Sequence, residues 1–533
     1  LWEQFKKDMG DTIGGSVSRF SKLAGYLYKL GISVNDLNQL MQFELLTLQG
    51  LLPEQFIYST EDLRADTPGV QMSFHRLYPA RIAERAKDGV LGKGWTHNWD
   101  FKLQKDSDGT IYLTSRTAGK RVFQPDSRGG YISMPGDKSV LSASGNGFIL
   151  AGLAGDSMSF SSDGLLEKMQ DSNGNSVSFQ YSSGKLSSLS HSSGKSINIQ
   201  YDGSGRISKV IDVYGRENTY SYDAEGMLIS ANDVFNNLAT YSYVSVAGVP
   251  SLSSVHEANG LSRSYEYDSV GRLASTDMGD GTGKKSFTYD MGETKIMDAL
   301  GNPFSFYFDH KGRLVKAKNS NGDSVFSSYD EDFNMLAATE PDGTSYKYAA
   351  DKAGNVTSMV NTAGKKMTYE YKSGTNLCLS AQNPLGAKIE YAYDSKFNAQ
   401  KMKLPDGSEF TAEYDQKGQL SKMTRPSGAQ KTCVYNSSGL IESESFSDGK
   451  TLKYSYDAYD RIIEILEESS GKSTKYAYDA HGNISQVKSS NGILLGFTYD
   501  ELDRRTAIND EKGTLLEYEY DDFNRITAIR HSG

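Results

Sequence analysis

The fold of this chain is decided by Ser264-Tyr265-Glu266-Tyr267-Asp268-Ser269-Val270-Gly271-Arg272-Leu273, a pattern that returns along most of its 533 residues. Two tyrosines that lie two residues apart fall on one face of a β-strand, and aromatic residues suit a pleated sheet. Asp268 can accept backbone N–H groups two residues on in an Asx turn, and Gly271 supplies a positive φ without steric cost. Leu273 then begins a return strand. The stretch therefore predicts one β-hairpin.

The Tyr-Asp dipeptide recurs at nearly constant spacing. From Tyr393 onward, successive aromatic anchors are separated by 21, 21, 21, 22, 21 and 21 residues. A fixed period of this length is the signature of a repeat architecture. We expect a structural role in the repeat hairpins for Tyr201, Asp202, Gly205, Tyr222, Asp223, Gly226, Tyr267, Asp268, Gly271, Tyr393, Asp394, Tyr414, Asp415, Tyr456, Asp457, Tyr478, Asp479, Tyr499, Asp500, Tyr520 and Asp521.

A lone hairpin is marginal in water, so the repeats must pair with one another. Two strands per repeat between Phe160 and Tyr520 give about 35 antiparallel strands, far more than an ordinary open sheet holds. Sheet twist makes a flat ribbon of that width improbable, and we expect a barrel, a spiral or a closed shell. The 34 tyrosines within a hydrophobic fraction of only 37% favour a hollow wall over a filled sandwich.

Composition narrows the classes of function. The net charge is −10 and no basic run is present, which argues against a nucleic-acid partner. No apolar run reaches the roughly 18 residues of a membrane span. Cys378 and Cys433 could pair, but two unpaired, partly buried thiols are favoured. No signal peptide is visible, and because the chain starts at Leu1 and stops at Gly533 after the last repeat, both ends read as cut from something longer.

The first 57 residues differ from the rest and predict helices. Phe5, Met9, Ile13, Val17, Phe20 and Leu23 fall at helical spacing. A second helix is predicted from Val34 to Met41, with Ser33 or Asn35 as N-cap and an apolar stripe at Leu37, Leu40, Met41 and Leu45. This segment is interpreted as a helical cap on an open strand edge. A plug in the mouth of a shell and an interaction helix for another module are the alternatives.

No catalytic, cofactor or metal site emerges from the motifs. The seven histidines are far apart in sequence, with no spacing typical of zinc ligands. Trp95, His97 and Trp99 could surround a sugar, but alternation on a strand favours packing in the core or wall. The turns at 106–109 and 171–175 faintly resemble calcium loops, yet Asx turns explain them better. We therefore expect a protein that is not an enzyme.

Three features together carry a resemblance to a known family. They are the strand Phe74-His75-Arg76-Leu77-Tyr78, the stretch Gly92-Lys93-Gly94-Trp95-Thr96-His97-Asn98-Trp99, and the Tyr-Asp array. In this combination residues 65–533 resemble the RHS/YD-repeat proteins, which include bacterial RHS toxins, cocoon components of insecticidal toxin complexes, and teneurins. The resemblance implies a β-strip that spirals into a hollow YD shell, with Gly92, Gly94, Trp95, His97 and Trp99 at its start.

The resemblance also implies how the chain is divided and what it does. We expect a helical segment at 1–57, the start of a β-rich core at 58–150, and the YD shell at 151–533. The favoured function is a secreted or cell-surface shell that encloses a C-terminal effector or toxin domain, absent from this chain, and that engages a delivery component. The alternative is an adhesion or scaffold module that binds protein or glycan through its outer turns. The self-cleaving core end of toxin-bearing members has no match at 524–531.

Overall fold

The computed structural model describes residues 1–115 and 119–531. Its helices are α1 (Trp2–Met9), α2 (Ile13–Lys29), α3 (Leu37–Gln49) and α4 (Ile82–Arg85). Its strands before the long sheet are β1 (Phe56–Ala65), β2 (Met72–Pro79), β3 (Thr96–His97), β4 (Phe101–Lys105), β5 (Ile111–Ser115), β6 (Gly119–Pro125) and β7 (Tyr131–Ser133).

The long sheet comprises β8 (Val140–Ser144), β9 (Gly147–Ala151), β10 (Ser157–Phe160), β11 (Leu166–Gln170), β12 (Ser176–Ser182), β13 (Lys185–His191), β14 (Ser196–Tyr201), β15 (Ile207–Ile211), β16 (Glu217–Tyr222), β17 (Leu228–Asn232), β18 (Leu238–Val246), β19 (Val249–His256), β20 (Ser262–Tyr267), β21 (Leu273–Asp277), β22 (Lys285–Asp290), β23 (Glu293–Met297), β24 (Pro303–Phe308), β25 (Leu314–Lys318), β26 (Ser324–Tyr329) and β27 (Met335–Thr339).

It continues through β28 (Ser345–Ala350), β29 (Val356–Asn361), β30 (Lys366–Tyr371), β31 (Cys378–Gln382), β32 (Lys388–Tyr393), β33 (Ala399–Lys403), β34 (Glu409–Tyr414), β35 (Leu420–Thr424), β36 (Gln430–Tyr435), β37 (Ile441–Phe446), β38 (Thr451–Tyr456), β39 (Ile462–Glu467), β40 (Lys472–Tyr478), β41 (Ile484–Ser489), β42 (Leu494–Tyr499), β43 (Arg505–Asp510), β44 (Gly513–Tyr520) and β45 (Ile526–His531).

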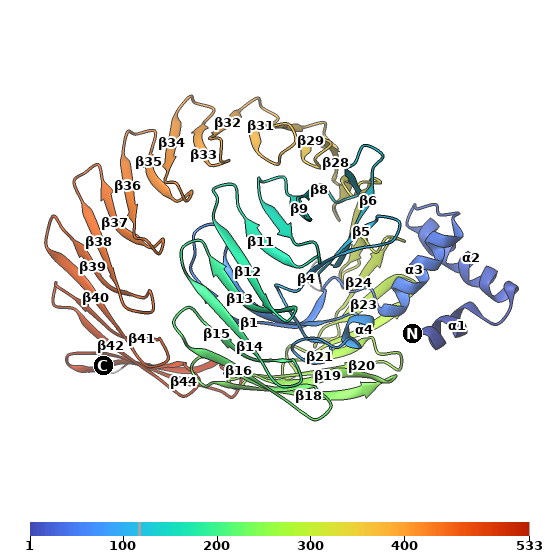
Figure 1. Cartoon of the computed structure of the whole chain (residues 1–533), viewed down its shortest axis with the longest axis horizontal. Helices are drawn as coiled ribbons and strands as arrows, with labels where there is room; N and C mark the ends of the chain where they lie inside the picture. The colour runs from blue at the N-terminus through green and yellow to red at the C-terminus, as the bar shows by residue number, and fades with distance from the viewer. Residues whose placement is uncertain (116–118, 532–533) are drawn as a thin grey trace.

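Strand order in this sheet follows chain order from β8 to β45, and the sheet curves round on itself as a shell (Figure 1). Each repeat is one antiparallel hairpin: Tyr265 of β20 faces Thr276 of β21, and a bulge then brings Tyr267 opposite Leu273. The same register recurs far along the chain, with Tyr454 opposite Ile465 and a bulge before Tyr456. The predicted all-β hairpin strip is therefore confirmed.

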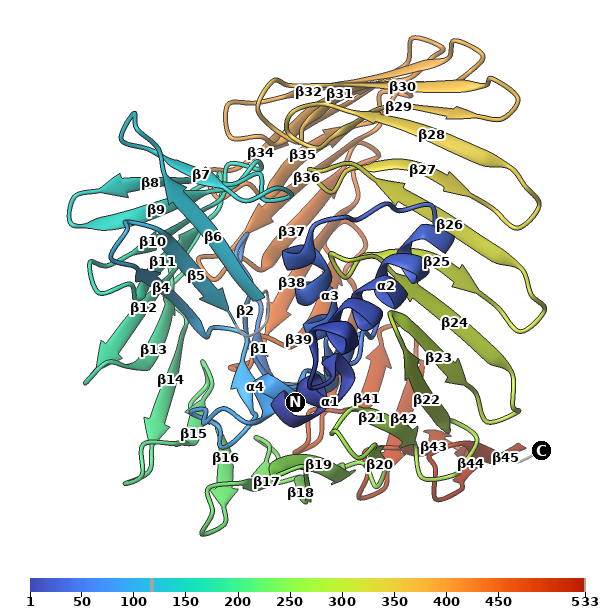
Figure 2. The same ribbon diagram turned by 90° about the vertical axis from the view of Figure 1, so that its right-hand side faces the viewer.

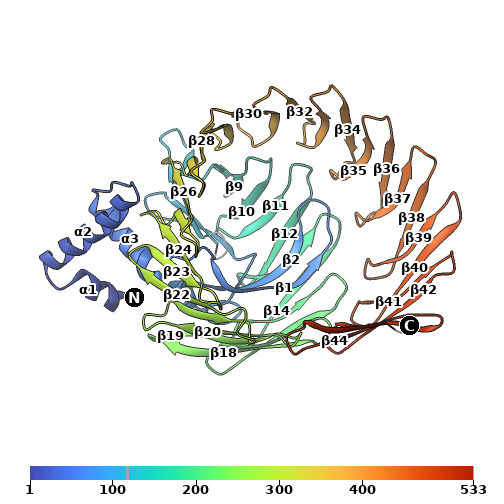
Figure 3. The ribbon, with the colours of Figure 1, turned by 180° about the vertical axis from the view of Figure 1, so that it is seen from behind.

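A second layer of structure lies inside the curve of the sheet. Figure 3 shows β1 and β2 within the ring, and we call residues 56–103 the inner layer. Its buried side chains, including Phe74, Tyr78 and Trp95, form one hydrophobic core with strands from β8 to β21. We call β8–β21 the first half of the strip and β26–β45 the second half. The expected boundary at residues 150 and 151 falls within β9.

The helical segment lies across one end of the shell, ringed by strands (Figure 2), and it differs from the prediction in two details. One run of helical spacing is divided, because α1 ends before Gly10 and α2 starts after Thr12, whose side chain caps Gly15 N. The second helix starts later than predicted and its N-cap is Asp36, which accepts the N–H groups of Asn38 and Gln39.

The buried stripe of α3 also differs from the prediction. Leu40 is buried as expected, but Leu37, Met41 and Leu45 are exposed. The buried face instead consists of Leu40, Phe43, Glu44, Thr47 and Leu48. The reason is that α3 packs with α2 on one side and on the β22–β23 turn on the other, which the helix's own periodicity does not reveal. No helix among the described residues is long and apolar enough to cross a membrane.

Candidate functional site: repeat unit, inner face and seam

The turn of each repeat is organised by its aspartate. Asp268 Oδ1 accepts the N–H groups of Val270 at 3.1 Å and Arg272 at 2.9 Å, and Arg272 Nε donates to Asp268 Oδ2 at 2.7 Å. Gly271 adopts φ +96°. The same arrangement surrounds Asp202 and Asp457. Burial by itself raises the pKa of Asp457, but hydrogen bonds from Arg461 and Tyr459 outweigh it and hold the pKa below its usual value.

The second tyrosine of each pair links its repeat to the preceding one. In most repeats its hydroxyl donates to the carbonyl oxygen of a residue at or near the start of the previous return strand, 15 or 16 residues earlier. Tyr267 donates to Leu252 at 2.6 Å, and Tyr393 donates to Cys378 at 2.8 Å. The same bond is made by Tyr181, Tyr201, Tyr222, Tyr243, Tyr289, Tyr329, Tyr414, Tyr435, Tyr456, Tyr478, Tyr499 and Tyr520.

Where the residue after the turn glycine is arginine, it adds a second link between repeats. The guanidinium carbon of Arg206 lies 4.5 Å from the ring centroid of Tyr222, and that of Arg272 lies 4.7 Å from Tyr289. A cation over an aromatic face contributes about 0.5–2 kcal/mol, depending on burial. The Tyr-Asp motif therefore builds the turn within one repeat and ties it to the next.

The first tyrosine of each pair points to the inner face, and in the first half it is buried by the inner layer. Tyr220 and Tyr241 are 5% and 4% exposed. Arg76 of β2 lies between them, with its guanidinium carbon 5.3 and 5.4 Å from their ring centroids. The carboxylate of Asp62 in β1 accepts hydrogen bonds from the Arg76 guanidinium at 2.6 and 2.8 Å and from Tyr220 Oη at 2.6 Å. Burial raises the pKa of Tyr220 well above its usual value, so its hydroxyl stays a donor.

The residues expected at the start of the shell lie in this core. Trp95 Nε1 donates to Tyr243 Oη at 2.7 Å, and Trp99 Nε1 donates to Ser73 O at 2.6 Å. His97 stacks on Phe74. The strand covers only Thr96–His97, so the expected alternation of all three on one strand is wrong. The tryptophans instead meet different neighbours, because the chain turns on both sides of this two-residue strand.

Gly92 allows the inner layer to approach the wall, and Gly94 allows close packing within the inner layer. They adopt φ +90° and +77°. A Cβ on Gly92 would lie 2.7 Å from Gly226 O, and a Cβ on Gly94 would lie 2.9 Å from the Tyr78 ring. Both positions therefore exclude a side chain through space as well as through φ.

The inner face of the second half carries equivalent tyrosines, and no inner layer formed by the described residues covers them. Tyr391, Tyr454, Tyr476 and Tyr518 are partly exposed. Among the described residues after Leu273, the buried hydrophobic side chains of the strip are Phe308, Val315 and Cys433. Cys378 and Cys433 form no disulfide. Burial, together with a hydrogen bond from its hydroxyl to Glu444 at 3.0 Å, raises the pKa of Tyr454 to about 12.

Turns of the two halves meet along a line that we call the seam. Lys195 and Tyr214 of the first half both contact Asp460, at 2.6 and 2.9 Å. Asn173 and Asn398 exchange side-chain hydrogen bonds at 3.0 and 2.9 Å. Further contacts join Lys138 to Asp332, Asn175 to Lys417, Phe235 to His481, Asn259 to Asn524 and Asp280 to Arg525.

The seam coincides with a departure from the repeat motif. Five second-half turns place another residue at the positive-φ position that glycine usually occupies, namely Phe333, Phe397, Asp460, Asp503 and Asn524, at φ +58° to +72°. Such a conformation costs L-residues about 1–2 kcal/mol. Asp460 and Asn524 use their side chains to bond the first half, while Phe397 lies where a Cβ on Gly155 would meet its ring. The strain is thus located where the halves join.

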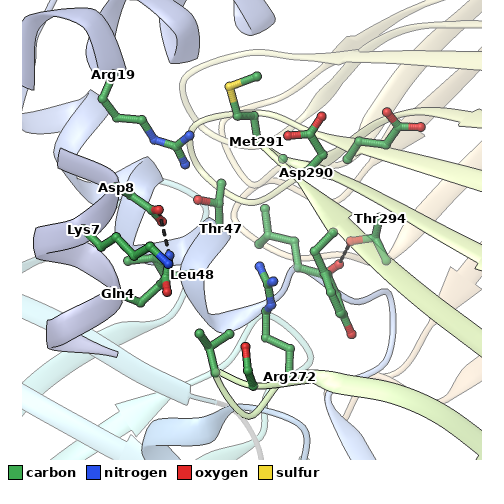
Figure 4. Close-up of a pocket in the computed structure, with 16 residues that line it drawn as sticks. Gln4, Lys7, Asp8, Arg19, Thr47, Leu48, Arg272, Asp290, Met291 and Thr294 are labelled. Atoms are coloured by element: carbon green, nitrogen blue, oxygen red, sulfur yellow. Dashed lines mark hydrogen bonds between the residues drawn. The ribbon is translucent and has the colours of Figure 1, made fainter. Parts of the chain in front are cut away.

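The helices dock on the wall through polar as well as apolar contacts. Tyr26 Oη donates to Gly292 O at 2.7 Å and accepts Phe308 N at 3.1 Å, and Thr294 Oγ1 donates to Leu51 O. A pocket of about 350 Å³ lies between the helices and the wall. The helices line it with Lys7, Asp8 and Arg19, and the wall lines it with Arg272 and Asp290 (Figure 4).

A buried ion pair lies beside this pocket. Glu44 Oε2 accepts Arg19 Nε at 3.0 Å. Burial raises the pKa of Glu44 despite that arginine, and nearby Asp8 adds to the rise. The helices of this segment are therefore held to one another by charge as well as by apolar contact, and hydrogen bonds hold the segment on the wall.

The sequence motifs revealed the repeat but not the inner layer or the seam. One signal for the seam was present, because the turns at Phe333, Phe397 and Asp460 lack the expected glycine. For the inner layer, the signal was the pair of glycines at Gly92 and Gly94, because glycine permits close packing of the backbone. Both signals indicate that the backbone makes a close contact at these positions, but neither shows which residues are contacted.

Comparison with known proteins gives two family matches. The model described as "Teneurin YD-shell" matches residues 159–299, 284–444 and 450–532. A domain of unknown function, DUF6531, matches residues 55–123, which include the whole inner layer. Among curated relatives, the tRNA nuclease WapA of Bacillus subtilis (strain 168) is 31% identical over 149 residues, which are 27% of this chain and 6% of that protein.

Solved structures give similarities at low identity. A crystal structure of TcdB2-TccC3-Cdc42 matches at 11% identity and a TM-score of 0.43, over 89% of this chain and 35% of that one. A Photorhabdus luminescens Tc holotoxin pore with a TccC3 substitution matches at 11% identity and a TM-score of 0.44, over 97% and 34%. The chain thus spans about a third of the solved chains and a small part of the curated relative.

Proposed function

This chain belongs to the teneurin YD-shell family, and from that premise we propose that it is a non-enzymatic containment shell that encloses a polypeptide effector until delivery. The observation that carries the proposal is the contrast between the two inner faces. In the first half, the inner tyrosines are buried under the chain's own inner layer, whereas Tyr391, Tyr454 and Tyr476 are left partly exposed on the equivalent face.

A polypeptide fits that uncovered face for a physical reason. Exposed tyrosines and aliphatic residues on a concave sheet offer apolar area with hydroxyl tips, and burying apolar area stabilises a complex by about 25 cal/mol per Å². The inner layer is itself a polypeptide on the same kind of surface, held by Arg76 and Trp95. The helices across the end of the shell restrict access from that side (Figure 2). Export to the cell exterior is part of the proposal.

The test is protection of an attached polypeptide. An unfolded, protease-sensitive segment is joined after Gly533, and in a matched control the same segment is joined before Leu1. Limited proteolysis should spare the C-terminal segment while the shell is folded and cleave the N-terminal one. Replacing Tyr391, Tyr454 and Tyr476 by aspartate should abolish the protection at a temperature where circular dichroism shows that the wall of the variant is folded. Equal cleavage at both ends of the folded protein would contradict containment.

A second candidate function is adhesion through the outer turns. It is favoured by two leucines at turn tips, Leu300 and Leu385, which are 88% and 93% exposed. Isolated exposed leucines are common, so the two must act together to matter. If they form an adhesive surface, Leu300→Glu with Leu385→Glu should abolish binding to cells or to wall fragments and leave protection of an attached segment unchanged.

A further inference from the structure

A polar pocket of about 280 Å³ lies where the inner layer, the first half and the second half meet. Strand β1 contributes Asp62, the first half contributes Asn218 and Asn232, and the second half contributes the turn of Glu501 and Asp503. The volume lies just below the range of about 300–1,000 Å³ that is typical of small-molecule sites. An occupant would contact three parts of the chain that are far apart in sequence.

Two of the side chains that line the pocket carry buried hydrogen-bond acceptors that lack donors. Asn218 is 1% exposed; its Nδ2 donates to Asp62 O at 2.7 Å, which fixes the amide, while its Oδ1 has no partner among the described residues. Oδ1 of Asn232 is likewise buried and unpaired. A buried acceptor without a donor is costly, and such groups are normally satisfied by a ligand, an ion or water. The occupant should therefore donate.

The charges around the pocket define the kind of donor. Its acidic lining residues are Glu61, Asp62, Asp233, Glu257, Glu501 and Asp503, against a single lining cation, Arg76. Three of these carboxylates also contact basic side chains outside the lining: Glu61 contacts His75, Glu257 contacts Arg263, and Asp503 contacts His481. Arg76 is already engaged by Asp62 and by Tyr241. Within residues 1–115 and 119–531, no three His, Cys, Asp or Glu side chains are grouped closely enough to hold a metal ion. Dispersed acceptors fit a ligand whose cationic donors are themselves separated.

We propose that this pocket binds an aliphatic ammonium cation of the polyamine class. An alkylammonium group carries three donors and no acceptor, which complements the unpaired oxygens of Asn218 and Asn232. Its charge complements the acidic rim, and its methylene chain packs against Ala231 and Ala239, which also line the pocket. Because the site includes the Glu501–Asp503 turn, the ligand fastens the second half to the first half and stabilises the assembled shell.

The experiment measures binding of spermidine to the whole chain by calorimetry and by thermal shift at fixed ionic strength. We expect spermidine to raise the melting temperature, and sodium chloride or magnesium chloride of equal ionic strength to give a much smaller shift. Asn218→Ala and Glu501→Gln should each weaken spermidine binding at least about fivefold, which corresponds to losing one charged or buried contact. Glu501 is exposed, so its variant tests the site even if Asn218→Ala folds poorly.

The matched control is Glu511→Gln, which removes an exposed glutamate from a second-half turn outside the pocket. It should bind spermidine like the parent protein. Nα-acetyl-lysine amide distinguishes a free amine from a lysine side chain of a partner polypeptide, and binding of either probe that depends on Asn218 and Glu501 supports the site. The proposal is overturned if neither probe binds, or if Glu501→Gln and Glu511→Gln weaken binding equally through general charge.

Discussion

The two halves of the strip use the same hairpin and differ in what covers it. In the first half, Tyr241, the first tyrosine of the Tyr241/Tyr243 pair, is buried beneath Arg76 and Trp95, whereas its counterpart Tyr391 of the second half is partly exposed. The register is equivalent, with Tyr241 opposite Val255 and Tyr391 opposite Met402. A repeat motif therefore specifies the wall, while the inner layer determines which part of the wall is a core and which part is a surface.

The largest difference in the loss of unfolding free energy is expected for variants that remove one partner of a buried ion pair. Arg76→Met leaves Asp62 buried without its cation and should lower the free energy of unfolding by about 3–5 kcal/mol. The matched second-half change, Arg461→Met, removes a partly exposed pair with Asp457 and should cost about 1 kcal/mol or less. Denaturant unfolding of both variants measures the contrast. Equal losses would mean that the inner layer contributes no special stability.

The next contrast concerns the aromatic rings. Tyr241→Ala creates a cavity in a filled core and should cost about 3–5 kcal/mol, as other buried aromatics do. Tyr391→Ala removes a partly exposed ring and should cost about half as much, because less apolar area returns to water. Calorimetric melting of the two variants, with Ser242→Ala as the exposed control, tests the difference. A Tyr391→Ala loss as large as that of Tyr241→Ala would show that the second-half face is also covered.

The hydroxyl link between repeats gives a smaller contrast. Tyr393→Phe removes only the bond to Cys378 O and should cost about 0.5–1.5 kcal/mol. Tyr243→Phe removes the equivalent bond to Leu228 O and also the buried bond that Tyr243 Oη accepts from Trp95 Nε1, so we expect about 2–4 kcal/mol. Comparison of the two denaturation midpoints checks this, and identical midpoints would argue against coupling between the inner layer and the ladder.

The seam is expected to change local opening more than global stability. Phe397→Gly relieves a positive-φ strain of about 1–2 kcal/mol and removes a contact of similar size with the Gly155 turn. Hydrogen exchange should therefore accelerate in the first-half turn around Gly155 with little change in melting temperature. Leu385→Gly, at an exposed turn tip outside the seam, is the control and should leave that exchange unchanged.

Acid should affect the two halves alike, because their turns are built alike. The folded-state pKa values of Asp202 and Asp457 both lie below the ordinary value of about 3.9, since hydrogen bonds outweigh burial. Their contribution to stability is thus present above about pH 3.9 and is lost as the pH falls through the folded pKa. Asp202→Asn and Asp457→Asn should each flatten the melting-temperature profile below pH 4 by the same small amount.

The sequence predicted the repeat well because everything that makes it is local. Tyr265, Asp268, Gly271 and Leu273 lie within nine residues, and their strand, Asx turn and return strand form without distant partners. The N-cap of α3 is Asp36, one residue after the predicted Asn35. A difference of one or two residues is usual at helix ends.

The inner face and the seam required contacts that no local pattern encodes. Arg76 meets Tyr241 across 165 positions, and Asn173 meets Asn398 across 225. The positive-φ residues at the seam, such as Phe397, break the local rule because they serve a distant contact. Such breaks in an otherwise regular repeat are where long-range structure can be sought.

Residue-resolved modification of tyrosine in the intact protein tests the central claim most directly. With a reagent small enough to enter the shell, Tyr220, Tyr241 and Tyr265 should be protected, while Tyr391, Tyr454 and Tyr476 should react, because only the first set is covered by the inner layer. Equal protection of both sets would contradict the account, since it would mean that the second half also has a filled inner face.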